Sequence, residues 1–129
     1  MKVLIVDDDN IVRRVLKRAV LGLEHEAVGC VDAEQALEAM DRDNFPLVIL
    51  DWMLPGMDGL ELCRRIRKRP GGQNCFVLMV TAKNTHEDLM EVLDAGADDY
   101  IAKPIDVKLL KTRITVAERM IKKLDTLRK

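Results

Sequence analysis

Long apolar runs, aromatic side chains and an excess of charge of one sign are all scarce in this chain of 129 residues. The first apolar run, Val3 to Val6, is too short for a signal-peptide core or a membrane span, so we expect a cytoplasmic protein without membrane contact. A formal net charge of -1 provides no global attraction to nucleic acid. We therefore expect no direct nucleic-acid binding by this domain.

The chain also lacks the cysteine spacing of a disulfide framework or zinc site and the glycine spacing of a phosphate-binding loop. Cys30, Cys63 and Cys75 are odd in number, widely separated and placed in apolar stretches, which favours reduced core thiols over a disulfide framework or a zinc site. There is no Gly-rich phosphate loop, so nucleotide binding is not expected. A chain that is 48% hydrophobic and 33% charged at this length is typical of one compact soluble domain.

Short apolar segments alternate with segments of helical periodicity along the chain. We expect strands at residues 2–6, 26–31, 47–50, 75–80 and 100–102, each followed by a helix. The uninterrupted run from Leu47 to Leu50 is typical of a strand buried on both faces of a parallel sheet. We predict the α/β class: a flavodoxin-like, doubly wound, five-stranded parallel sheet in the order 2-1-3-4-5, with five helices in three α/β/α layers. Asp32 with Gln35 and Asp58 with Glu61 have the spacing of capping boxes at two helix starts.

Polar residues follow the apolar strands at one edge of this predicted sheet. Asp7 and Asp8 follow the first strand, and Asp51, Thr81 and Lys103 follow the third, fourth and fifth. Because the carboxyl ends of parallel strands share an edge, these side chains should meet there. Clustered carboxylates repel unless a cation neutralises them, and hard oxygen ligands suit Mg²⁺. An aspartate nucleophile, a divalent cation, a hydroxyl donor and an ammonium are the equipment for accepting a phosphoryl group.

This pattern resembles the receiver domain of response regulators, the CheY-like family of two-component phosphorelay systems. The resemblance covers nearly the whole chain, and its motifs, weak individually, are specific in this order and spacing. The matching motifs are Asp7-Asp8, the run from Asp51 to Gly59, Thr81-Ala82, Tyr100 and Lys103-Pro104. The resemblance implies a signalling phosphoprotein, not an enzyme with a separate substrate, that receives its phosphoryl group from a sensor histidine kinase or a phosphotransfer protein.

The resemblance also assigns the acceptor and the metal ligands. It makes Asp51 the phosphoacceptor. Asp8, Asp51 and the backbone carbonyl of Met53 would coordinate Mg²⁺ or Mn²⁺ directly. Asp7 would bind the metal largely through water, and Asp9 would have no ligand role.

Phosphoryl binding and switching are assigned in the same way. Thr81, Lys103 and the backbone of Ala82 would bind the phosphoryl oxygens. The Lys103-Pro104 peptide bond would be cis, as an X-Pro bond permits. Thr81 would move toward the phosphoryl group and Tyr100 would turn inward. This movement would change the face made by the fourth helix, fifth strand and last helix, and so control an output domain or a partner.

The same residues bear on two alternative functions. A haloacid-dehalogenase-like phosphatase needs an aspartate two residues after its nucleophile, and Met53 in that position cannot exchange a proton. A receiver that serves only for docking, without phosphorylation, is disfavoured by intact Asp51, Thr81 and Lys103. Met53 and Lys83 each lie two places beyond a site residue, where we expect them to gate the access of water.

The C-terminal helix, expected over about residues 106–128, has apolar residues at alternating steps of three and four. These residues are Val107, Leu110, Ile114, Ala117, Ile121 and Leu124. The spacing is that of a coiled-coil seam. Because the strands are short, the sheet should be exhausted beyond about Ala117, and Ile121 and Leu124 should need another partner. We therefore predict a single domain over residues 1–129 whose last helix extends as a linker or coiled coil toward an absent output domain. A homodimer could form through this helix or the switch face.

Overall fold

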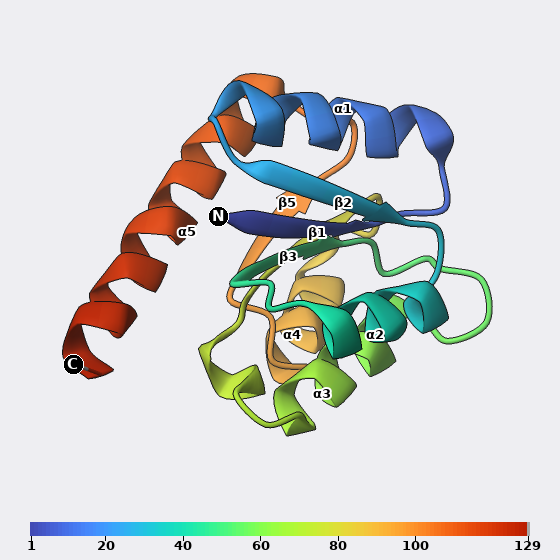
Figure 1. The fold of residues 1–129 in the computed structure, drawn as a ribbon. Coiled ribbons are helices and arrows are strands. Elements are labelled where there is room, and N and C mark those ends of the chain that lie inside the picture. Colours follow the sequence, from blue (N-terminus) through green and yellow to red (C-terminus); the bar gives the residue numbers. More distant parts are fainter. Residues whose placement is uncertain (129) are drawn as a thin grey trace.

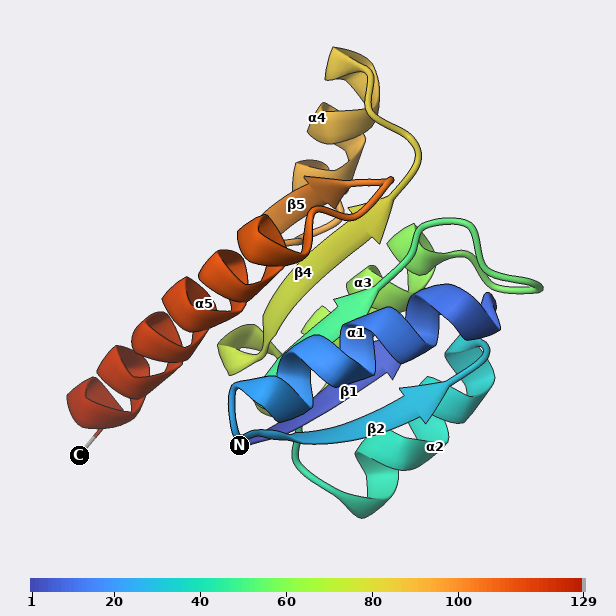
Figure 2. The same cartoon turned by 90° about the horizontal axis from the view of Figure 1, so that it is seen from above.

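A computed structural model describes residues 1–128 as a twisted sheet with helices on both faces (Figures 1 and 2). The strands are β1 (Lys2–Val6), β2 (Glu26–Cys30), β3 (Leu47–Leu50), β4 (Phe76–Thr81) and β5 (Asp99–Ala102). All neighbouring strands pair in parallel, in the order β2-β1-β3-β4-β5. The predicted flavodoxin-like, doubly wound fold is confirmed, with strand ends shifted by about one residue.

Helices cover the two faces unequally. They are α1 (Asn10–Gly22), α2 (Ala33–Arg42), α3 (Gly59–Lys68), α4 (His86–Asp94) and α5 (Val107–Arg128), with a 3₁₀ turn η1 (Gly72–Asn74). Figure 1 shows α1 and α5 against one face of the sheet and α2, α3 and α4 against the other. Alternate strand residues supply the two cores: Ile49 and Leu78 lie in the α1/α5 core, and Leu50 and Met79 lie in the other. This explains why β3, and β4 as far as Val80, are apolar without a break.

Aspartates cap the starts of four helices: Asp9, Asp32, Asp58 and Asp106 accept amides in the first turns of α1, α2, α3 and α5. In the two predicted capping boxes this half is confirmed, but the predicted return bond from the side chain of Gln35 or Glu61 to the cap amide is wrong. Asp32 accepts the amide of Gln35 and Asp58 accepts the amide of Glu61. The Gln35 side chain bonds to the amide of Val31, one residue before the cap. The Glu61 carboxylate instead faces arginines one turn further along α3. The two-way capping box begins α4, between Thr85 and Asp88.

The expectation that Ile121 needs a partner outside this chain is wrong. Ile121 is 7% exposed and belongs to the α1/α5 core. Phe45, Pro46 and Cys75, at the amino ends of β3 and β4, line a cavity of about 160 Å³ together with Ile121, so these connections lie at the level of Ile121 in the domain. Leu124 is 39% exposed. None of the described helices has the length and apolar character that a membrane crossing requires.

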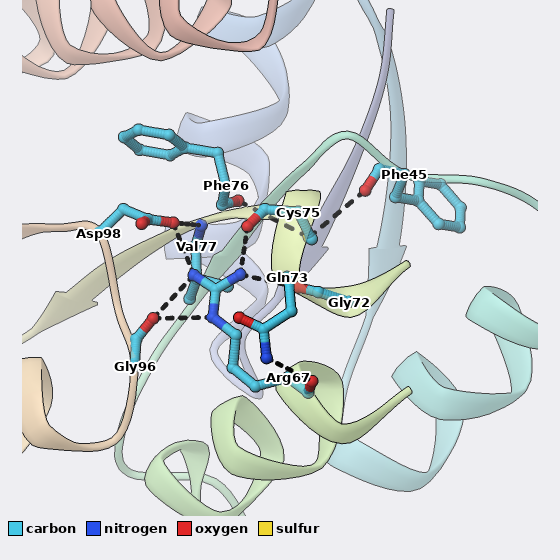
Figure 3. Close-up of polar contacts among 9 residues, drawn as sticks. All are labelled: Phe45, Arg67, Gly72, Gln73, Cys75, Phe76, Val77, Gly96 and Asp98. Atoms are coloured by element: carbon cyan, nitrogen blue, oxygen red, sulfur yellow. Dashed lines mark hydrogen bonds and ion pairs between the residues drawn. The ribbon is translucent and has the colours of Figure 1, made fainter. Parts of the chain in front are cut away.

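Arg67 of α3 joins several segments at the sheet edge opposite the acidic residues (Figure 3). Its guanidinium donates to the carbonyls of Gly72, Cys75 and Gly96 and to the Asp98 carboxylate, which lies 2.6 Å from Nη2. All five guanidinium N–H groups are used in this way. Because Gly96 directly follows the last turn of α4, this network fixes the carboxyl end of that helix.

The three cysteines are buried and free, in agreement with the expected core thiols. Burial raises the pKa of the Cys63 thiol to about 11 and that of the Cys75 thiol to about 12. The Cys75 thiol donates to the carbonyl of Phe45, 3.4 Å away. These thiols fill the core and take no part in the acidic edge.

Candidate functional site

Three carboxylates meet at the carboxyl edge of the sheet. β1 and β3 are neighbours, and their ladder continues one residue past the strands because the Asp51 amide donates to the Val6 carbonyl over 3.1 Å. Asp7 and Asp51 are 1% and 5% exposed, whereas Asp8 is exposed. One carboxylate oxygen from each of Asp7, Asp8 and Asp51 lies within 4.8 Å of the others. The strand-end positions therefore bring together the acids that the sequence placed at this edge.

Lys103 neutralises part of this charge. Its Nζ lies 2.8 Å from Oδ2 of Asp51 and 2.9 Å from Oδ2 of Asp7. The Lys103 amide donates to the Thr81 carbonyl over 2.9 Å, and the Lys103-Pro104 peptide bond is cis. Burial alone would lower the pKa of Lys103, but its hydrogen bonds to Asp51 and Asp7 outweigh burial and raise it. Lys103 is therefore the charged ammonium of the site.

Asp7 is the most deeply buried of the three acids. Burial raises the pKa of its carboxyl, against the opposing effects of the Asp9 amide and of Lys103. The Asp9 amide donates to Asp7 Oδ1 over 2.9 Å, and the Arg13 guanidinium donates to the Asp7 backbone carbonyl over 2.7 Å. Sequence reasoning missed the Arg13 contact, because a backbone acceptor leaves no signature in the sequence.

The donor set fits a hard divalent cation. All three clustered side chains offer carboxylate oxygens, and one ammonium leaves their charges only partly compensated. Oxygen ligands of this kind are those that Mg²⁺ prefers. The Met53 amide donates to Oδ1 of Asp51 over 3.2 Å, which holds the acceptor loop against the carboxylate, while the Met53 side chain is exposed.

Gly59 allows α3 to begin directly against the backbone of Asp51, a close approach that sequence reasoning did not predict. Its amide donates to the Trp52 carbonyl over 2.8 Å. A Cβ at position 59 would lie 2.0 Å from the backbone oxygen of Asp51, far inside van der Waals contact. Only glycine fits this approach, so α3 supports the peptide that carries Asp51.

Thr81 and Tyr100 lie on neighbouring strands and are joined through one residue. Thr81 is fully buried at the end of β4, and its Oγ1 accepts the amide of Lys83 over 3.3 Å. The half-buried Tyr100 of β5 donates its hydroxyl to the backbone carbonyl of Lys83. Ala82, between Thr81 and Lys83, is exposed. Thr81, whose carbonyl accepts the amide of Lys103, is therefore connected to Tyr100 through the backbone of Lys83.

Comparison with known proteins identifies the family. Residues 3–115 match the family model of the response regulator receiver domain. Response regulator MprA of Mycobacterium leprae is 38% identical over 122 residues, which are 95% of this chain and 53% of MprA. The chain spans about half the length of the curated relatives it matches. The chain therefore belongs to the receiver domains of response regulators, the signalling proteins of two-component systems.

Solved structures agree with this assignment. The chemotaxis response regulator CheY4 of Vibrio cholerae has a TM-score of 0.85 at 25% identity, over 90% of this chain and 97% of that one. The receiver domain of the sensor histidine kinase PA1611 from Pseudomonas aeruginosa has a TM-score of 0.82 at 26% identity, over 94% and 97%. That structure holds a magnesium ion coordinated in its active site cleft.

Proposed function

We propose that this domain is switched by phosphorylation and accepts one phosphoryl group on Asp51. The donor would be the phosphohistidine of a sensor histidine kinase or of a phosphotransfer protein. The observation that carries the proposal is the position of Asp51 at a strand end, beside two further carboxylates and 2.8 Å from the Lys103 ammonium. The family assignment supports the same donor chemistry.

In the transfer step, a carboxylate oxygen of Asp51 forms the new bond to phosphorus. The bond from phosphorus to the donor imidazole nitrogen breaks, and its electron pair stays on that nitrogen. Asp8, Asp51 and the Met53 carbonyl would hold Mg²⁺ or Mn²⁺ directly, with Asp7 bound through water. When bound, the cation supplies positive charge to the phosphoryl oxygens.

The chain's own groups bind the transferred oxygens. The Lys103 ammonium, already shared between two carboxylates, can move one contact to a phosphoryl oxygen without leaving the site. The Thr81 hydroxyl and the Ala82 backbone would bind the others. Such preorganised donors stabilise charge that develops during transfer.

Switching would run from Thr81 to Tyr100 and then to the face made by α4, β5 and α5. The contacts of both residues with Lys83 support this order. The altered face would control an output domain or a partner. Residues 1–129 would act as one receiver domain, with α5 as its linker or, with the switch face, as a homodimer contact.

Intact-mass measurement after incubation with acetyl phosphate tests this function. We expect one added phosphoryl group in the presence of Mg²⁺, none with a chelator and none in Asp51→Ala. Asp9→Asn serves as the matched control because Asp9 lies in the same acidic loop and caps α1 instead of facing the cluster. Modification that persists in Asp51→Ala, or that is indifferent to chelation, would overturn the proposal.

A further inference from the structure

Lys83 makes three different contacts that meet at the edge of the candidate site. Its amide donates to Thr81 Oγ1 over 3.3 Å, and its backbone carbonyl accepts the Tyr100 hydroxyl. Its ammonium lies over the ring of Trp52, 4.4 Å from the ring centroid. We call this set of contacts the Lys83 bridge. It links the residue after the proposed acceptor to both residues of the proposed switch.

Trp52 is a fixed platform for the Lys83 side chain. Its side chain belongs to the core on the α2/α3 face and is 7% exposed. The Trp52 carbonyl accepts the amides of Leu54 and Gly59, at 3.1 and 2.8 Å. The negative face of an indole ring attracts a cation placed over it. The ring therefore holds Lys83 at a position set by the peptide next to Asp51.

The far end of the turn that carries Lys83 is fixed by the capping box between Thr85 and Asp88, whereas the residues before it have few buried contacts. Among residues 82–87, which connect β4 to the first turn of α4, Lys83 is half-buried and the others are exposed. A turn with few buried contacts is poorly fixed by packing. The backbone groups that bind Thr81 and Tyr100 therefore depend on where the Lys83 side chain is anchored.

We propose that Lys83 is a positioning residue that couples the phosphoryl site to Tyr100. Its ammonium, held on Trp52, fixes the β4–α4 turn so that the carbonyl stays the acceptor of the Tyr100 hydroxyl. A change at either Thr81 or Trp52 then reaches Tyr100 through one residue. This inference rests on the proposed function and names the residue that carries its regulation.

The chain offers a clean probe, because Tyr100 is its only tyrosine and Trp52 its only tryptophan. Incorporating 3-fluorotyrosine gives a single ¹⁹F resonance that reports the surroundings of the Tyr100 ring. The variants are Lys83→Ala, Lys83→Met, which keeps the apolar stem, and Lys83→Arg, which keeps the cation. Lys68→Ala, at an exposed lysine of α3, is the matched control.

In the unphosphorylated protein, we expect Lys83→Ala and Lys83→Met to displace the Tyr100 resonance and the Trp52 emission. A cation–π contact at a partly exposed site corresponds to a change of about two- to fivefold in the ratio of bridged to released Tyr100. Lys83→Arg should restore both signals, and Lys68→Ala should leave them unchanged. Far-UV circular dichroism confirms that each variant is folded.

The bridge is overturned if both Lys83→Ala and Lys83→Met keep the wild-type Tyr100 resonance, or if Lys83→Arg fails to restore it. This resting comparison decides the bridge even if Asp51 accepts no phosphoryl group, an outcome that intact mass reports separately. Where the wild type is phosphorylated, the shift that phosphorylation causes at Tyr100 should be smaller in Lys83→Met. An undiminished shift would also refute the coupling.

Discussion

Replacing Asp8 by Asn should stabilise the protein in a chelator and should remove the stability that Mg²⁺ gives to the wild type. Without a cation, the Asp8 carboxylate faces Asp7 and Asp51, and Lys103 compensates only one of those two charges. Asp8→Asn keeps the size of the side chain and removes this repulsion. With a cation present, the same carboxylate becomes a ligand. The substitution therefore stabilises the protein in a chelator and destabilises it, relative to the wild type, in Mg²⁺.

The size of the effect follows from the distances. Because Lys103 compensates one of the two charges of Asp7 and Asp51, about one negative charge remains within 4.8 Å of the Asp8 carboxylate. Coulomb repulsion at that separation is about 1 kcal/mol in water and about 3.5 kcal/mol at an effective dielectric constant of about 20. Because Asp8 is exposed, the lower value applies, and we expect the free energy of unfolding to rise by about 1 kcal/mol in chelator. At about 100 times its dissociation constant, Mg²⁺ should add about 2.7 kcal/mol to the wild type and little to Asp8→Asn.

Urea unfolding followed by Trp52 fluorescence, with EDTA or with Mg²⁺, measures both free energies. Asp9→Asn is the control, since Asp9 accepts the amides of Ile11 and Val12 as the cap of α1, and asparagine caps a helix about as well. Its stability should stay within about 0.5 kcal/mol of wild type in EDTA, and it should keep the full gain from Mg²⁺. A loss of stability for Asp8→Asn in EDTA, or a full Mg²⁺ gain in that variant, would refute the electrostatic argument.

Two further predictions concern the frame around the site. Gly59→Ala should lower the free energy of unfolding by about 2–4 kcal/mol in urea, through overpacking and a weakened hydrogen bond. Gly56→Ala, at a φ of 73° with nothing within 4 Å, should cost only about 1 kcal/mol of backbone strain; equal losses would contradict the close approach at Gly59. Ellman's reagent at pH 8 should react slowly with Cys63 and Cys75 in the native protein, because their raised pKa values keep them as thiols. After unfolding, it should react rapidly with all three cysteines, including Cys30, whose pKa is also raised in the native protein. Rapid reaction of the native protein would contradict their burial.

The sequence predicts the fold and the acidic cluster for the same reason. In a parallel sheet, the residue after each strand is placed at one edge by strand order alone. Asp7, Asp51 and Lys103 therefore follow from the ends of three apolar runs, and the structure brings them within hydrogen-bond distance. Their proposed roles in phosphoryl transfer are a separate matter of chemistry, which the Asp51→Ala experiment addresses.

Contacts that depend on side-chain conformation or on backbone acceptors could not be predicted in this way. The guanidinium of Arg67 binds three carbonyls, and a carbonyl has the same chemistry at every position of a chain. Glu61 has the spacing of a capping box, but Arg64 and Arg65 lie within reach and compete for its carboxylate. Lys83 lies 31 positions after Trp52 in the sequence, and no periodicity relates them. Competition among partners in space decides such contacts.

The error over Ile121 changes which surface of α5 is open to a partner. The strands end before Ile121, but Ile121 packs in the α1/α5 core, and Phe45 and Cys75 line the cavity beside it. Substituting Ile121 by a charged residue would therefore disrupt the core of the single domain. Met120 and Leu127, 51% and 81% exposed, lie two helical turns apart on another face of α5. A test of pairing through this helix must consequently alter Leu127, because a change there leaves the core intact and any altered sedimentation can be attributed to the helix surface.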